Sequence, residues 1–151
     1  MSKQKLVIAS DHAGFDFKAS LKDSLAGQGY EVIDLGAHST ESVDYPDIAA
    51  ALAGAIRDGS ADRGILICGT GIGISIAANR HAGIRAALCH DTTGARLSRQ
   101  HNDANVLVMG ARVTGIEVAK DCVATFLATP FEGGRHSRRV DKDRKSTRLN
   151  S

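Results

Sequence analysis

The sequence predicts an α/β protein in which two layers of helices enclose a five-stranded, mostly parallel sheet, forming a three-layer sandwich. Short apolar runs alternate five times with segments of helical periodicity, and the connections between them are short. One unit is especially informative. Its apolar run, Ile65–Ile67, is followed by Cys68, three glycines and a small-residue helix. That order is typical of a buried strand, an anion-binding loop and a helix N-terminus.

Local patterns predict the other elements. Phe17, Leu21 and Leu25 recur at intervals of four and give a helix over residues 14–27 one apolar face. Pro46 suits the first turn of a second helix, because its fixed backbone angle is that of a helix start. The predicted strands are residues 5–10, 30–35, 65–67, 84–88 and 105–109.

Two helix caps are predicted. Asp91 precedes the fourth helix and is placed to accept hydrogen bonds from its first N–H groups. Thr114–Glu117 has the spacing of a capping box, in which the threonine and glutamate side chains each bond a backbone N–H at a helix start. The polar residues 36–44 are predicted to form a loop.

Composition limits the class of protein. The chain of 151 residues is long enough for one domain with a sizeable core. A net charge of +2 and 4% aromatic residues give no reason to expect nucleic-acid binding, and no apolar stretch approaches the length of a membrane span. No signal peptide is recognised, and three cysteines without paired spacing favour a reducing compartment. We therefore expect a cytoplasmic protein.

The character of the chain changes after Pro130. The segment that follows is basic and contains glycines, and residues 142–151 have little apolar periodicity. We therefore predict a domain over residues 1–141 and a C-terminal tail over residues 142–151, either disordered or non-native in origin. Arg135 and Arg139 are four residues apart, so they share a face if this segment is helical, and two such arginines suit a phosphate group.

Polar and glycine residues follow several of the predicted strands. Asp11 and His12 come after the first strand, residues 68–73 after the third, Asp91 after the fourth and residues 110–112 after the fifth. Ligands of open parallel sheets bind at this carboxyl edge. The combination of histidine, arginine and glycine there predicts a phosphate pocket.

Cys68 is the candidate reactive group. Its place at a glycine loop that leads into a helix favours the thiolate, which is the basic and nucleophilic form of cysteine. Cys89 and Cys122 lie in segments typical of core packing. The alternative for Cys68 is a small thiol that merely fills the end of a strand.

Five motifs together resemble one family. They are Ser10–Phe15, Asp44–Pro46, Cys68–Gly73, Leu97–Asp103 and Glu132–His136. In this combination and order the chain is similar to type B ribose-5-phosphate isomerases, a family with galactose-6-phosphate and allose-6-phosphate isomerases. The resemblance implies a Rossmann-like fold and a metal-free and cofactor-free aldose–ketose isomerisation through an enediol in the pentose phosphate pathway. It also implies homodimers, or dimers of such dimers, with shared active sites.

The resemblance assigns roles to individual residues. Cys68 would be the base, the backbone N–H groups of Gly69, Gly71 and Gly73 would stabilise the enediolate, and Thr70 and His101 would assist opening of the sugar ring. The sugar would contact Asp11, Tyr45 and Asn102, and the phosphate would contact His12, Arg112, Arg135 and Arg139. The residues expected from the neighbouring subunit are His101, Asn102, Arg112, Arg135 and Arg139.

Other functions stay open at this point. The loop gives G-x-G-x-G with Asp91 about 20 residues on, which suggests a dinucleotide binder, but Ile74 occupies the place of the third glycine. A non-catalytic sugar-phosphate sensor could use the same fold. Within the isomerases, the substrate could be ribose 5-phosphate, allose 6-phosphate, galactose 6-phosphate or a tetrose phosphate. Six histidines and three cysteines show no metal-ligand spacing, so no metal is expected.

Overall fold

The computed structural model describes residues 3–150, with side chains described through Arg144. Its five strands form one sheet of order β2-β1-β3-β5-β4, and every pairing is parallel. The strands are β1 (Lys5–Ser10), β2 (Glu31–Asp34), β3 (Arg63–Cys68), β4 (Ala86–Leu88) and β5 (Val106–Gly110). The predicted Rossmann-like α/β fold with five strands is confirmed.

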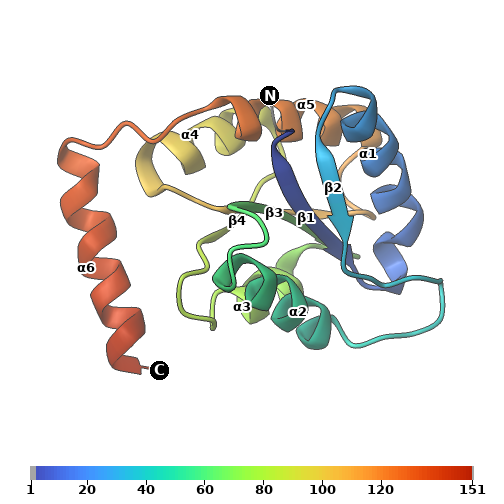
Figure 1. The fold of residues 1–151 in the computed structure, drawn as a ribbon, viewed down its shortest axis with the longest axis horizontal. Coiled ribbons are helices and arrows are strands. Elements are labelled where there is room, and N and C mark those ends of the chain that lie inside the picture. The colour runs from blue at the N-terminus through green and yellow to red at the C-terminus, as the bar shows by residue number, and fades with distance from the viewer. Residues whose placement is uncertain (1–2, 151) are drawn as a thin grey trace.

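Helices cover both faces of the sheet (Figure 1). One layer holds α1 (Phe15–Gly27), α4 (Thr92–Asn102) and α5 (Ile116–Ala128), and the other holds α2 (Tyr45–Arg57) and α3 (Ile72–Ala78). Side chains of β1 alternate between the two cores: Leu6 and Ile8 pack in the first, Val7 and Ala9 in the second. This alternation is the period-2 pattern of a strand buried on both faces.

One predicted cap is confirmed and the other is wrong. The Asp91 side chain accepts a hydrogen bond from the N–H of Gly94 at 2.7 Å. By contrast, α5 begins after Gly115 with no side-chain cap. The N–H of Thr114 instead bonds the carbonyl of Gly110, which holds this residue in the turn after β5, and its buried hydroxyl has no partner among the described residues.

The C-terminal segment is helical. Helix α6 (Arg135–Asn150) begins where the basic segment begins and continues through the residues expected to form an irregular tail. In Figure 1 it stands beside the sandwich, next to the end of α4. His136 and Val140 are the buried residues of its described part. The domain boundary at residue 141 stays a prediction. Across residues 3–150, none of the helices combines the length and apolar character needed to cross a bilayer.

A buried lysine fixes the loop after β2. Lys18 is 1% exposed, and its Nζ donates to Asp34 Oδ1 at 2.8 Å and to the carbonyl of Ala37 at 2.5 Å. Lys22 and the N–H of Gly36 also donate to Asp34, each at 2.9 Å. Burial opposes ionisation of this carboxyl group, but these hydrogen bonds outweigh burial and hold the pKa of Asp34 below its usual value.

Replacing Asp34 with Asn should destabilise the protein by about 3 kcal/mol at pH 7, because it leaves the Lys18 ammonium buried without a counter-charge. Since the folded-state pKa of Asp34 is the lower one, its contribution is present above the unfolded-state pKa and is lost as the pH falls through the folded-state value. Urea unfolding at pH 7 and at pH 3 should therefore show a smaller difference at pH 3. Glu117→Gln, at an exposed carboxylate, is the control; equal midpoints at pH 7 for Asp34→Asn and wild type would refute the assignment.

Candidate active site

Cys68 ends β3 and is 5% exposed. Its Sγ accepts a hydrogen bond from the N–H of Gly71 at 3.2 Å, so the sulfur faces the loop that leads into α3. Gly71 has a φ of +81°, in the region that favours glycine, and a Cβ there would lie 2.5 Å from Leu88 Cδ1. The loop therefore folds back over the cysteine and lies close to the neighbouring strands.

Two functional side chains pack on glycines of this loop. A Cβ at Gly73 would lie 2.8 Å from the Tyr45 ring, and a Cβ at Gly69 would lie 3.2 Å from Arg112 Nη1. Tyr45 begins α2, whereas Arg112 follows β5. The absence of side chains at Gly69 and Gly73 thus lets an aromatic ring and a guanidinium group approach the loop closely.

Asp11 and His12 are held at the end of β1. The buried Asp11 carboxylate accepts hydrogen bonds from the N–H groups of Ala13 at 3.0 Å and Gly14 at 3.3 Å, and so caps the short 3₁₀ helix η1 (His12–Gly14). His12 Nδ1 accepts from the N–H of Val43 at 3.1 Å. This bond assigns the ring proton of the neutral form to Nε2, which leaves Nε2 as a hydrogen-bond donor.

Backbone hydrogen bonds bring these groups to one edge of the sheet. The N–H of Asp11 bonds the carbonyl of Ile67 at 3.1 Å, and the N–H of Arg112 bonds the carbonyl of Gly69 at 2.9 Å. The predicted site residues gathered at this carboxyl edge are Asp11, His12, Tyr45, Cys68, Gly69, Thr70, Gly71, Gly73 and Arg112. The family resemblance implied that Arg112 reaches the site from the neighbouring subunit. The structure corrects this, because Arg112 directly follows β5, whose end lies beside that of β3.

The remaining site residues lie at the opposite edge. His101 and Asn102 end α4, which runs back along the sheet to the start of β5. There the carbonyl of Asn105 accepts from the N–H of Gly64, near the start of β3. Strands advance about 3.3 Å per residue, so the length of β3 separates this edge from Cys68 by roughly 15–20 Å. Within one chain, His101 therefore does not reach Cys68.

Arg135 and Arg139 project from α6 near the end of α4. Arg139 lines a cavity of about 360 Å³ between these helices, and the cavity is also lined by Arg85, His101, Asn102, His136, Val140 and Asp143. The predicted site residues thus fall into two groups, here called half-sites: a carboxyl-edge half-site with the thiol, and an α4–α6 half-site with His101, Asn102, Arg135 and Arg139.

The comparisons with known proteins identify the family of the chain. Residues 6–142 match the family described as Ribose/Galactose Isomerase. The chain belongs to this family. Ribose-5-phosphate isomerase B of Escherichia coli is 51% identical over 138 residues, covering 91% of this chain and 93% of that protein. The structure of ribose-5-phosphate isomerase B from Clostridium thermocellum has a TM-score of 0.96 at 52% identity, covering 98% of this chain and 100% of that chain.

Not every relative in the Ribose/Galactose Isomerase family carries the same name. D-erythrulose-4-phosphate isomerase of Pectobacterium atrosepticum is 46% identical over 138 residues and covers 91% of this chain and 91% of its own length. Membership in this family therefore leaves the sugar open.

Beside the shared motifs of this family, the structure reveals a cluster that the sequence did not predict. The side chains of His101, Glu132 and His136 meet where α4 contacts the segment before α6. Their potential ligand atoms lie within 4.8 Å of one another. Glu132 follows His101 by 31 residues and precedes His136 by 4, and this spacing matches no local metal motif. Only the packing of α4 against α6 could therefore have disclosed the cluster.

The cluster is a poor fit for a metal ion. Tetrahedral zinc with ligands near 2.1 Å would hold them about 3.4 Å apart, whereas the two histidine Nε2 atoms lie 3.7 Å and 3.8 Å from Glu132 Oε1. The imidazole rings are also stacked nearly parallel, at 15° and 4.3 Å, so they do not converge on one point. Arg139 and Arg85 line the same cavity and add positive charge. The arrangement suits electrostatic contact between the carboxylate and the rings better than coordination.

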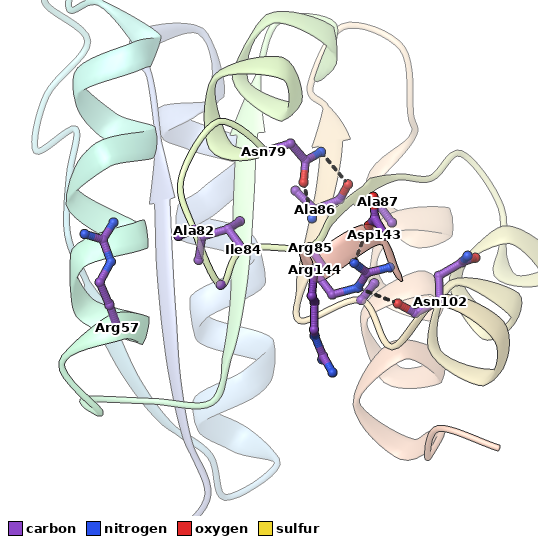
Figure 2. Close-up of a pocket in the computed structure, with 12 residues that line it drawn as sticks. Arg57, Asn79, Ala82, Ile84, Arg85, Ala86, Ala87, Asn102, Asp143 and Arg144 are labelled. Carbon is purple, nitrogen blue, oxygen red and sulfur yellow. Dashed lines mark hydrogen bonds and ion pairs between the residues drawn. The ribbon is translucent and has the colours of Figure 1, made fainter. Parts of the chain in front are cut away.

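A larger cavity of about 840 Å³ lies beside the first, and Figure 2 shows the residues around it. Asn102 is the one predicted site residue on its wall. Arg85 joins the two cavities: its Nε donates to the carbonyl of Asn102 at 2.8 Å and its Nη1 pairs with Asp143 at 2.5 Å. Arg85 is therefore a basic residue beside the α4–α6 half-site that no motif indicated.

Replacing Gly73 with Ala should weaken binding of a phosphorylated sugar-acid inhibitor by about tenfold, because the added Cβ displaces the Tyr45 ring. Gly54→Ala is a matched control, since Gly54 is also helical and has open space around it. Alanine raises helix propensity equally in both variants. A lower inhibitor affinity in Gly73→Ala alone therefore reports the displacement of the Tyr45 ring. Calorimetric titration measures the affinity, and identical dissociation constants for the two variants would contradict this role of Tyr45.

Proposed function

We propose that the chain is an aldose–ketose isomerase that interconverts ribose 5-phosphate and ribulose 5-phosphate. The observation that carries this proposal is a buried thiol whose sulfur faces the backbone N–H of a glycine loop, with Asp11, His12 and Arg112 held at the same edge. The names of relatives that cover nearly the whole chain support the same activity. A coupled assay with ribose 5-phosphate tests it.

The proposed reaction begins with ring opening. His101 and Thr70 assist removal of the proton from the O1 hydroxyl and delivery of a proton to the ring oxygen, so the C1–O4 bond breaks and an aldehyde forms. The Cys68 thiolate then takes the proton from C2, and the electron pair moves through the C1–C2 bond onto O1. Return of that proton to C1, with transfer of the O2 proton to O1, gives the ketose. These proton transfers require no redox cofactor.

The loop and the arginines supply the electrostatics. Backbone N–H groups of Gly69, Gly71 and Gly73 stabilise the enediolate oxygen in this proposal, which is the role of an oxyanion hole. Asp11, Tyr45 and Asn102 hold the sugar hydroxyls. His12, with its donor at Nε2, and Arg112, Arg135 and Arg139 hold the phosphate.

A homodimer would complete this site. The two half-sites lie at opposite edges of one chain, so His101 can meet a Cys68 only if the latter belongs to another copy. A second chain would also exclude water from the reacting sugar. We therefore propose that each active site combines the carboxyl edge of one subunit with the α4–α6 half-site of its partner, in a dimer or a dimer of dimers. The cytoplasmic location and the place in the pentose phosphate pathway stay predictions.

A tetrose phosphate is the second candidate substrate, because one relative is named a D-erythrulose-4-phosphate isomerase. Steady-state kinetics on ribose 5-phosphate, D-erythrulose 4-phosphate, allose 6-phosphate and galactose 6-phosphate, measured side by side, separate these possibilities. Turnover of none of them, with binding retained, would favour a sensor over an enzyme.

Replacing Cys68 with Ala should lower kcat by at least about 100-fold, the scale of a positioned base, while inhibitor binding persists. Cys89→Ala is the control, because that thiol is buried in the core and burial raises its pKa to about 11. Initial rates and calorimetric titration give the two quantities. Near-normal turnover by Cys68→Ala would mean that another group is the base.

Mixing two inactive variants, Cys68→Ala and His101→Asn, should restore activity. In a mixed dimer with shared sites, one site collects both substitutions and the other collects neither, so about half of the sites recover. The two chains are unfolded and refolded together, and mixed dimers are isolated by distinct affinity tags. Mixed dimers without activity would show that each site is built from one chain.

A further inference from the structure

The cluster of His101, Glu132 and His136 is a built arrangement. The N–H of Glu132 bonds the carbonyl of Gln100 at 3.1 Å, which ties the segment before α6 to the last turn of α4. The His136 ring lies against that of His101, with centroids 4.3 Å apart. One face of the His101 imidazole is therefore covered by a second aromatic ring, which restricts its rotamers.

A single carboxylate faces both rings. Glu132 Oε1 lies 3.7 Å from His101 Nε2 and 3.8 Å from His136 Nε2. His136 is 9% exposed, and its Nε2 has no hydrogen-bond partner in the described part of the chain. Such an unsatisfied buried nitrogen is unusual in a native protein. Here it lies beside a histidine that the proposed reaction uses.

The surroundings of His136 favour its neutral form. Burial first, and then the neighbouring His101, Arg135 and Arg139, lower the pKa of His136. The Glu132 carboxylate is the one acidic group of the cluster and faces both rings. The stacked ring of His136 supplies orientation, whereas the carboxylate supplies charge.

We propose that Glu132 and His136 are positioning residues that hold His101 in the orientation needed to open the sugar ring. The inference rests on the proposed isomerase function. Neither residue is assigned contact with the substrate, so both act through His101. A misplacement of a catalytic group by about 1 Å can cost about 100-fold in rate, so residues that orient an imidazole affect catalysis without touching the substrate.

Proton exchange on the ketose provides a selective test. Ribose 5-phosphate is a closed furanose and must be opened before its C2 proton can be removed. Ribulose 5-phosphate has no ring, because the hydroxyl that would close it carries the phosphate. The equilibrium constant ties net conversion in the two directions together, so a misplaced ring-opening group slows both. Exchange of the C1 proton of ribulose 5-phosphate with solvent passes through the enediolate without a ring, so that exchange should persist.

Glu132→Gln should lower kcat/KM with ribose 5-phosphate by about tenfold or more and change the exchange of the ribulose 5-phosphate C1 proton with deuterated solvent by less than about threefold. Glu132 is half exposed, so this variant should fold, and thermal unfolding verifies it. His136→Ala should show the same selective loss. His136→Phe should recover much of it, because phenylalanine preserves the stack. Glu117→Gln on α5, an exposed carboxylate outside either half-site, is the matched control.

Equal losses of net conversion and of C1 proton exchange, or no loss in Glu132→Gln, would overturn the inference. An ¹⁵N spectrum of the histidine rings gives a readout that needs no turnover: Glu132→Gln should shift the His101 signals, identified with His101→Asn, and Glu117→Gln should not. A wild-type protein inactive on both sugars would refute the proposed function alone. Unchanged His101 signals in Glu132→Gln would refute the positioning role alone.

Discussion

The close approach of the Thr70 carbonyl to the backbone of Gly110 is the constraint on which the carboxyl-edge half-site depends. Any side chain at Gly110 would collide with the peptide of Thr70. With glycine there, the loop after β3 lies on the end of β5, and the N–H of Arg112 can bond the carbonyl of Gly69. Strand pairing thereby holds Cys68, and a backbone hydrogen bond holds Arg112 beside it, which suits a site that must be preorganised.

Strand direction then determines what one chain can and cannot assemble. In a parallel sheet the carboxyl ends of β1, β3 and β5 share an edge, so Asp11, Cys68 and Arg112 come together without special contacts. A helix that returns along the sheet carries its last residues to the other edge, so His101 is removed from them. The separation is a property of the fold, and no side-chain rotamer can bridge the length of a strand.

Much of this was predictable from the sequence, because the signals involved are local. Apolar periodicity located the strands and helices, and the loop of Cys68 followed from its glycines. The capping box at Thr114 failed because the turn after β5 captured the N–H of that residue, and the start of this turn at Gly110 is set by its packing on the Thr70 backbone, which a local pattern cannot register. The helical state of residues beyond 141 was also missed, since that segment lacks an apolar stripe.

The least predictable feature was the meeting of Glu132 and His136 with His101, because it depends on how α6 docks. The docking surface is small: His136 and Val140 are buried, and the outer contacts are ion pairs such as that between Arg144 and Asp103 at 3.0 Å. Exposed pairs of this kind contribute little. The stack of His136 on His101 is therefore a principal anchor of α6, the helix that also carries Arg135 and Arg139. His136, which we propose to orient His101, thus also anchors the helix that carries the arginines proposed for the phosphate, so both ends of the sugar phosphate would be positioned by one contact.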